Sequence, residues 1–132
     1  MNAGNPFSYA LYRLVPRVER GERINVGVVL FSRPVDFLAA RTHLDEERAL
    51  ALQPDLDLDA VRPHLLAIER IAAGDHAGGP IAALDTTKRF HWLVAPSSTI
   101  IQPSAVHTGV CGDPAAQLER LFCELVATGP AG

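Results

Sequence analysis

Hydrophobic and polar positions divide the first third of the chain into three extended segments. Residues 8–15 are rich in aromatic and β-branched side chains and stop at a proline, which predicts a strand. Residues 24–31 are almost continuously apolar, as in a strand that is covered on both sides. A turn at residues 32–34 precedes a third predicted strand, residues 35–42. We therefore expect the chain to open with a three-stranded meander.

Helical periodicity follows in the middle of the chain. Residues 45–52 predict a short helix and residues 59–73 a longer one. Asp59 is the expected N-cap, which places Pro63 in the first turn, and Gly74 is expected to end the helix before a flexible connection. Its apolar stripe has the spacing of one buried face and consists of Val61, Leu65, Ile68 and Ala72.

The last third combines one further predicted strand with a long loop and a final helix. Residues 90–95 favour a strand, and residues 96–112 a loop with a short extended piece at 99–102. Asp113 and Pro114 are strong helix-start signals, and Gly129-Pro130 is the expected end. The apolar stripe of this helix consists of Leu118, Leu121, Phe122 and Leu125.

These elements predict an α+β fold in one domain, residues 1–132. Its sheet, mixed or antiparallel, would begin with the meander and be joined by residues 90–95. The two main helices would pack against it. Composition agrees, because 48% hydrophobic and 20% charged residues are typical of a globular protein. No stretch reaches the roughly 18 apolar residues of a membrane span, and no secretory signal is recognisable, so we expect a cytoplasmic protein.

Charge is distributed unevenly along the chain. Residues 1–41 hold six arginines and three acidic residues, a balance of +3. Because the whole chain has a net charge of −3, residues 42–132 carry −6. A basic face could attract an anion, whereas the negative total does not support general nucleic-acid binding. The alternative is that these charges are solvated faces of strands and helices.

Three polar residues stand in or beside the apolar segments of the first hairpin. If the two strands pair antiparallel, Arg13 lies within about one register step of Asn25. Gly27, on the same face as Asn25, would leave room for a ligand, and Glu22 is the nearest candidate partner of Arg13. The cluster fits either a ligand pocket or an internal network that fastens the hairpin.

The segment 96–112 is long for a loop, and such loops often carry function. Its hydroxyl, amide and imidazole groups belong to Ser97, Ser98, Thr99, Gln102, His107 and Thr108. These side chains could equally satisfy the backbone of the loop itself. His91 and His107 are candidate general acid–base groups, since imidazole titrates near neutrality, but a lone strand histidine is usually structural.

Established motifs for metals, nucleophiles and phosphates are missing from the sequence. His107, Cys111 and Asp113 are the nearest approach to a metal-ligand set, and neither Cys-x-x-Cys nor His-x-x-x-His occurs. There is no Gly-x-Ser-x-Gly, no Walker loop and no Gly-x-Gly-x-x-Gly. The sequence therefore predicts no metal and no cofactor.

Several short segments resemble one bacterial family. Residues 12–17 (Tyr-Arg-Leu-Val-Pro-Arg) and 20–28 (Arg-Gly-Glu-Arg-Ile-Asn-Val-Gly-Val) are similar to the opening of the domain of unknown function DUF3037. Residues 90–96, Gln102-Pro103 and 107–109 resemble its C-terminal part. The resemblance implies no activity. It does imply a protein partner, a HipA-like kinase encoded beside such proteins.

The leading hypothesis is a non-catalytic binding or regulatory module for an anionic ligand or a protein partner. Its surface would combine residues 17–23 with residues 96–107. The candidate binding residues are Arg13, Arg17, Arg20, Glu22, Asn25, His91, Ser98, Gln102 and His107. The competing hypothesis is a small enzyme acting on a phosphate ester or nucleic acid, in which a histidine transfers protons and Glu22 orients the substrate or acts as base. A structural protein that forms oligomers is a third possibility.

Overall fold

A computed structural model describes residues 4–97 and 99–127 of the chain, and within them the fold is α+β around an open antiparallel sheet. The predicted fold class is confirmed, and the sheet is antiparallel rather than mixed. Its strands are β1 (Asn5–Leu14), β2 (Ile24–Ser32), β3 (Phe37–Thr42), β4 (Ile101–Pro103) and β5 (His107–Cys111). Strands follow the order β3-β2-β1-β4, and β5 pairs with the same edge of β1 as β4.

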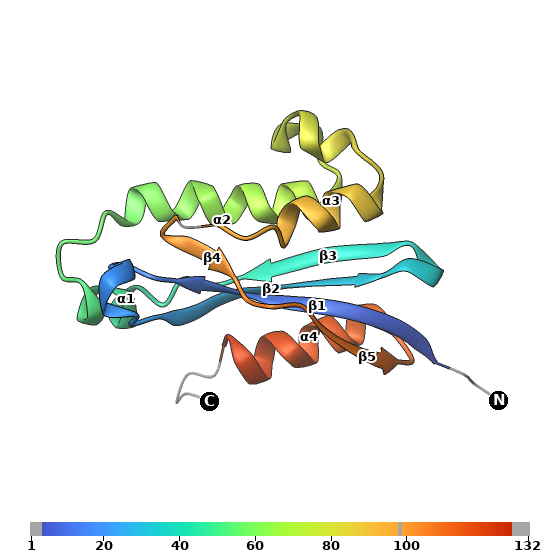
Figure 1. Cartoon of the computed structure of the whole chain (residues 1–132), viewed down its shortest axis with the longest axis horizontal. Helices are drawn as coiled ribbons and strands as arrows, with labels where there is room; N and C mark the ends of the chain where they lie inside the picture. The colour runs from blue at the N-terminus through green and yellow to red at the C-terminus, as the bar shows by residue number, and fades with distance from the viewer. Residues whose placement is uncertain (1–3, 98, 128–132) are drawn as a thin grey trace.

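Helices cover both faces of this sheet. The helices α2 (Leu58–Ala73) and α3 (Thr86–Leu93) lie on one face, and α4 (Pro114–Leu125) lies on the other (Figure 1). The short helix α1 (Glu46–Leu52) follows β3. None of the helices in the described residues is both long and apolar enough to span a bilayer.

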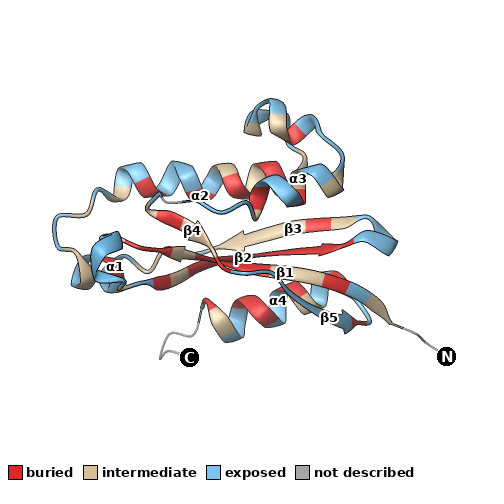
Figure 2. Ribbon diagram, viewed as in Figure 1, coloured by how far each residue is buried: buried red, intermediate tan, exposed pale blue. Residues whose placement is uncertain are grey.

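The core consists of two apolar clusters separated by the sheet. One lies under α2 and α3 and includes Ala10, Tyr12 and Leu14 of β1. The other lies under α4 and includes Phe7 and Leu11. Strand β2 contributes to both clusters and is buried along nearly its whole length (Figure 2). The prediction that residues 24–31 form a strand covered on both sides is confirmed.

A bulge in the β1–β2 hairpin sets which residues share a face. Tyr12 lies opposite Gly27, whereas Arg13 lies opposite Asn25, so Val26 is an extra residue in β2. The predicted closeness of Arg13 and Asn25 is confirmed. The prediction that Gly27 shares a face of the sheet with Asn25 is wrong, because the bulge puts Gly27 on the same face as Tyr12. A Cβ atom at Gly27 would lie 3.4 Å from the Tyr12 ring and 3.1 Å from the Arg41 carbonyl oxygen.

Residues 90–95 do not form a strand, which corrects the prediction for that segment. They belong mostly to α3, which begins after Asp85, whose carboxylate accepts a hydrogen bond from the backbone N–H of Lys88 at 2.8 Å. Phe90 and Leu93 are buried three residues apart, as a helix that packs on one side requires. A capped helix with one apolar side therefore replaces the expected strand.

The expected loop at residues 96–112 is also largely wrong, because β4 and β5 both lie within it. The predicted extended piece at 99–102 overlaps β4. Between the two strands, Ser104 continues the pairing with β1. Its backbone N–H donates to the Leu11 carbonyl at 2.7 Å, and its hydroxyl accepts from the Leu11 N–H at 2.9 Å. The segment is thus tied to the edge of β1 along most of its length.

The remaining helices follow their predictions closely. The stripe of α2 is buried as expected, and Gly74 ends this helix with φ 72°. Its N-cap is Asp57 rather than Asp59, so Pro63 lies inside the helix instead of in its first turn. Two short 3-10 helices, η3 (His76–Gly78) and η4 (Pro80–Ala83), take the place of the expected flexible connection.

The start of α4 is confirmed, with Asp113 as cap and Pro114 as its first residue. Three members of its predicted stripe, Leu118, Leu121 and Phe122, are buried. Leu125 is partly buried against the same cluster. The expected stop at Gly129-Pro130 lies outside the described residues.

Candidate functional site

Strands β2, β1 and β4 bring three candidate side chains into one row. Asn25 pairs with Arg13 across the first hairpin, and Arg13 pairs with Gln102 of β4. Register partners share a face of the sheet, and this face is the one covered by α4, because Asn25 donates to the Leu125 carbonyl at 2.9 Å. The segment 96–107 therefore reaches the hairpin through Gln102.

Within the part of the chain that the structure describes, Arg13 is the member of this row whose side chain has no partner. Its two neighbours are anchored, Asn25 to α4 and Gln102 to the Thr99 carbonyl at 2.9 Å. Arg13 is half-buried, and among the described residues its guanidinium makes no hydrogen bond and no ion pair. Glu22, the nearest candidate partner of Arg13, instead pairs with Arg20, whose Nε lies 2.9 Å from the Glu22 carboxylate.

The connection between β1 and β2 adds exposed charges beside the row. It contains the 3-10 helix η1 (Val18–Arg20), and Arg17 lies 3.9 Å from Glu19 in a loose, exposed ion pair. We refer to this surface as the hairpin end, which comprises Arg13, Arg17, Glu19, Arg20, Glu22, Arg23, Asn25 and Gln102. Its four arginines against two glutamates leave a balance of +2, although the whole chain has a net charge of −3.

The candidate histidines lie away from the hairpin end and from each other. His107 pairs with Tyr9, and the two rings lie 5.2 Å apart. Tyr9 is about 13 Å along β1 from Arg13, given a rise of about 3.3 Å per residue. His91 is exposed on α3, on the opposite face of the sheet. The described residues thus do not gather His91, His107 and Glu22 around one substrate. Ser98 lies outside the described residues.

A metal site would need several ligands close together. Within residues 4–97 and 99–127, no three His, Cys, Asp or Glu side chains are grouped so as to hold a metal ion. Asp113, the nearest sequence candidate, is engaged as the cap of α4, where it accepts from the Ala115 N–H at 3.1 Å.

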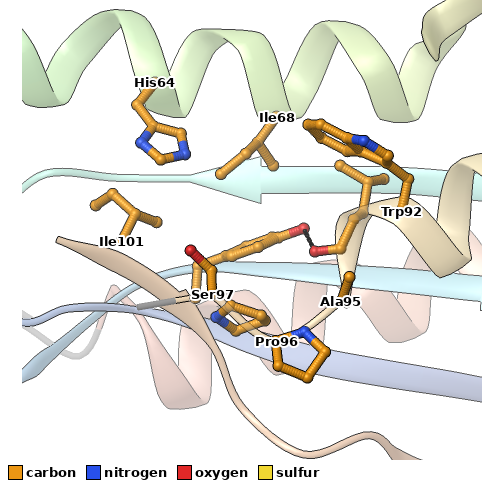
Figure 3. A pocket seen from close by; sticks show the side chains of 10 residues that line it. His64, Ile68, Trp92, Ala95, Pro96, Ser97 and Ile101 are labelled. Atoms are coloured by element: carbon orange, nitrogen blue, oxygen red, sulfur yellow. Dashed lines mark hydrogen bonds between the residues drawn. The ribbon is translucent and has the colours of Figure 1, made fainter. Parts of the chain in front are cut away.

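The sheet face under α2 carries a pocket that the sequence pattern does not indicate. Its volume is about 230 Å³. The pocket is bounded by α2, by the segment that joins α3 to β4, and by β4 itself (Figure 3). It is lined by Tyr12, His64, Ile68, Trp92, Leu93, Ala95, Pro96, Ser97, Ile101 and Pro103. We call it the Tyr12–Trp92 pocket.

The polar groups of this pocket are few and uncharged at neutral pH. The Tyr12 hydroxyl donates to the Leu93 carbonyl at 2.8 Å, and burial raises the pKa of Tyr12. Desolvation lowers the pKa of His64, which favours its neutral imidazole. Figure 3 shows His64 and Ile68 reaching in from α2, with Trp92 at the far side. Trp92 keeps 49% of its surface exposed.

None of the eight candidate binding residues that the structure describes lines this pocket, and for Arg13 and Gln102 strand alternation explains why. Gln102 lies between the lining residues Ile101 and Pro103 and faces the other way, as does Arg13 beside Tyr12. The pocket depends on α3 being a helix, since it is the helix that places Trp92 and Leu93 at its wall. Asp85 was the available clue, because it can cap a helix that includes Trp92 and Leu93, and the strand interpretation concealed it.

A model of one protein family matches residues 9–126 of the chain, and its description is "Protein of unknown function (DUF3037)". The chain belongs to the DUF3037 family. The DUF3037 match includes every residue of the hairpin end and of the Tyr12–Trp92 pocket. Neither the search of curated proteins nor the search of solved structures gave a match. Membership in DUF3037 therefore names no activity.

Proposed function

We propose that this DUF3037 chain is a non-catalytic binding or regulatory module, and that its hairpin end recognises an acidic surface of a protein partner. The proposal rests on the surroundings of the half-buried Arg13 side chain. A guanidinium presents five donors and stays charged, so a half-buried one normally has acceptors. Here the described residues supply none to Arg13, while its neighbours Asn25 and Gln102 are held in place.

The exposed arginines extend this surface beyond the sheet. Arg17 and Arg20 are more than half exposed, at 52% and 57% of their side-chain surface, so their ion pairs are weak and screened by salt. A partner carboxylate can replace such intrachain contacts at low cost. The local excess of positive charge would also accelerate encounter with an acidic surface.

The family resemblance makes a HipA-like kinase the first partner to test. A small anion is the alternative occupant of the same surface, because both present oxygen acceptors to Arg13. The two differ in size, so a protein partner would cover Arg17 and Arg20 together, whereas a small anion would need Arg13 alone. We do not extend the proposal to catalysis, since the candidate acid–base groups lie apart.

The experiment measures the affinity of the purified chain for any HipA-like kinase encoded beside it, by calorimetry at two salt concentrations. We expect the double variant Arg17→Ala/Arg20→Ala to bind at least tenfold more weakly and with less salt dependence. Arg33→Ala/Lys88→Ala is the charge-matched control, because both side chains are exposed outside the hairpin end, Arg33 in the turn between β2 and β3 and Lys88 in α3.

A normally folded double variant with full affinity would exclude the exposed arginines from the interface. A chain that binds inorganic phosphate through Arg13 but not the kinase would favour the anion alternative. Arg13→Met separates these cases, since it removes the charge and keeps most of the apolar stem. Weakened phosphate binding in this variant alone would identify a small-anion site.

A further inference from the structure

A second site lies on the opposite face of the same strands. We propose that the Tyr12–Trp92 pocket binds an uncharged, planar aromatic heterocycle of one or two fused rings. The pocket is mostly apolar, and a few polar groups converge on it. Such a recess is the usual form of a small-molecule site.

The size of the pocket limits the ligand to one or two rings. An engineered apolar cavity of about 150 Å³ binds benzene. The present pocket, of about 230 Å³, exceeds that volume by roughly the room that a second fused ring needs. It is smaller than the roughly 300–1,000 Å³ of pockets that hold larger ligands.

The walls favour a flat ligand. Trp92 and Tyr12 offer aromatic surfaces, and Pro96 and Pro103 offer rigid apolar ones. Aromatic rings gain from offset or edge contacts with other rings beyond simple burial. Trp92 is a large side chain with half of its surface exposed, and a ring seated in the pocket would cover part of it.

The electrostatics favour an uncharged ligand. The lining residues include no Asp, Glu, Lys or Arg, and neutral His64 offers one donor and one acceptor. The Ser97 hydroxyl and the Trp92 indole N–H are further polar groups at the wall. These groups can hydrogen-bond the ring heteroatoms, whereas an ionic ligand would lose its hydration without gaining a counter-charge.

This inference is independent of the function proposed above. Tyr12, Ile101 and Pro103 face the pocket, while Arg13 and Gln102, which alternate with them, face the hairpin end. A variant of one surface therefore leaves the other in place. Failure of partner binding would not bear on the pocket, and failure of ligand binding would not bear on the hairpin end.

The test uses NMR of the full chain labelled with nitrogen-15, because Trp92 is the only tryptophan. Its indole N–H gives a single side-chain resonance at the pocket wall. Unlabelled indole is the uncharged probe, and indole-3-carboxylate is the probe with the same rings and a charge. We expect indole to shift this resonance saturably, and indole-3-carboxylate to bind at least tenfold more weakly.

Two variants locate the binding. Ala95→Phe puts a ring into the pocket from an exposed position, and should weaken indole binding at least tenfold. Ala116→Phe makes the same change on α4, on the other face, and should have no effect. Trp92→Ala, read by saturation transfer to indole, should also weaken binding at least tenfold.

Three results would overturn the inference. A Trp92 resonance that does not saturate with indole would exclude a defined site. Equal affinity of Ala95→Phe and Ala116→Phe would place the binding elsewhere. Equal affinity for indole and indole-3-carboxylate would contradict the selection for uncharged ligands.

Discussion

Tyr12 shows what can be predicted at the scale of one residue. Strand alternation predicts that Tyr12 shares a face with Ala10 and Leu14, and all three are buried in the same cluster. The partner of its hydroxyl could not be predicted. That partner is the carbonyl of Leu93, 81 residues away, at the end of a helix that the local pattern does not indicate.

The stability of the chain should depend on the Tyr12 hydroxyl in a way that changes with pH. Below about pH 10, Tyr12→Phe should lower the free energy of unfolding by about 1–2 kcal/mol, because the Leu93 carbonyl loses its donor. Burial raises the folded-state pKa of Tyr12 above its unfolded value of 10.0. Above that pH the unfolded chain releases the Tyr12 proton while the folded chain keeps it. The free energy of unfolding of the wild type therefore falls by about 1.4 kcal/mol per pH unit, and that of the Tyr12→Phe variant is free of this loss.

The difference in free energy of unfolding between the wild type and Tyr12→Phe should therefore shrink above pH 10 and reverse within about two pH units. Urea unfolding from pH 7 to 11.5 measures it. Tyr9→Phe is the control, since no hydrogen bond of the Tyr9 hydroxyl occurs within the described residues. A difference that stays constant to pH 11.5 would show that the Tyr12 hydroxyl ionises as readily in the folded state.

At the scale of elements, local signals predict most of the helices and the first three strands. The failures have two physical causes. Residues 90–95 form a largely apolar run short enough to fit a strand, and the helix that contains most of them is recognised only from the cap at Asp85. Strands β4 and β5 are short, and their extended form depends on the edge of β1 rather than on their own residues.

The cap at Asp85 should accordingly contribute to the stability of α3. Asp85→Ala removes the acceptor of the Lys88 N–H, and should lower the free energy of unfolding by about 1 kcal/mol. Asp85→Asn keeps a capping oxygen and should cost much less. Urea unfolding followed by far-UV circular dichroism measures both. Equal losses in the two variants would show that the carboxylate charge, rather than the cap, supports the helix.

At the scale of the whole molecule, both candidate surfaces depend on the way the sheet is covered. Arg13, Glu22 and Asn25 of the hairpin end could be chosen from the sequence, because they stand in or beside apolar runs. The position of Gln102 beside Arg13 could not be predicted, because it follows from the pairing of β4 with β1. The pocket could not be chosen, because it exists only where α2, α3 and β4 meet over Tyr12.

The same arrangement predicts that the two faces of the sheet unfold together. Leu65 on α2 and Leu118 on α4 are each 4% exposed and belong to different clusters. Each change to alanine should lower the free energy of unfolding by about 2–5 kcal/mol. Because β1 and β2 contribute to both clusters, loss of either face should destabilise the whole sheet.

The fluorescence of Trp92 reports on the α2 face alone, since it is the only tryptophan, while circular dichroism reports on all helices. In Leu118→Ala, both signals should move to the same lower urea midpoint, as they should in Leu65→Ala. An unchanged Trp92 midpoint in Leu118→Ala, with an earlier partial loss of dichroism, would mean that α4 melts by itself. In that case the α4 cluster would be an attachment to the sheet, and the hairpin end, which Asn25 links to α4, could open without disturbing the pocket.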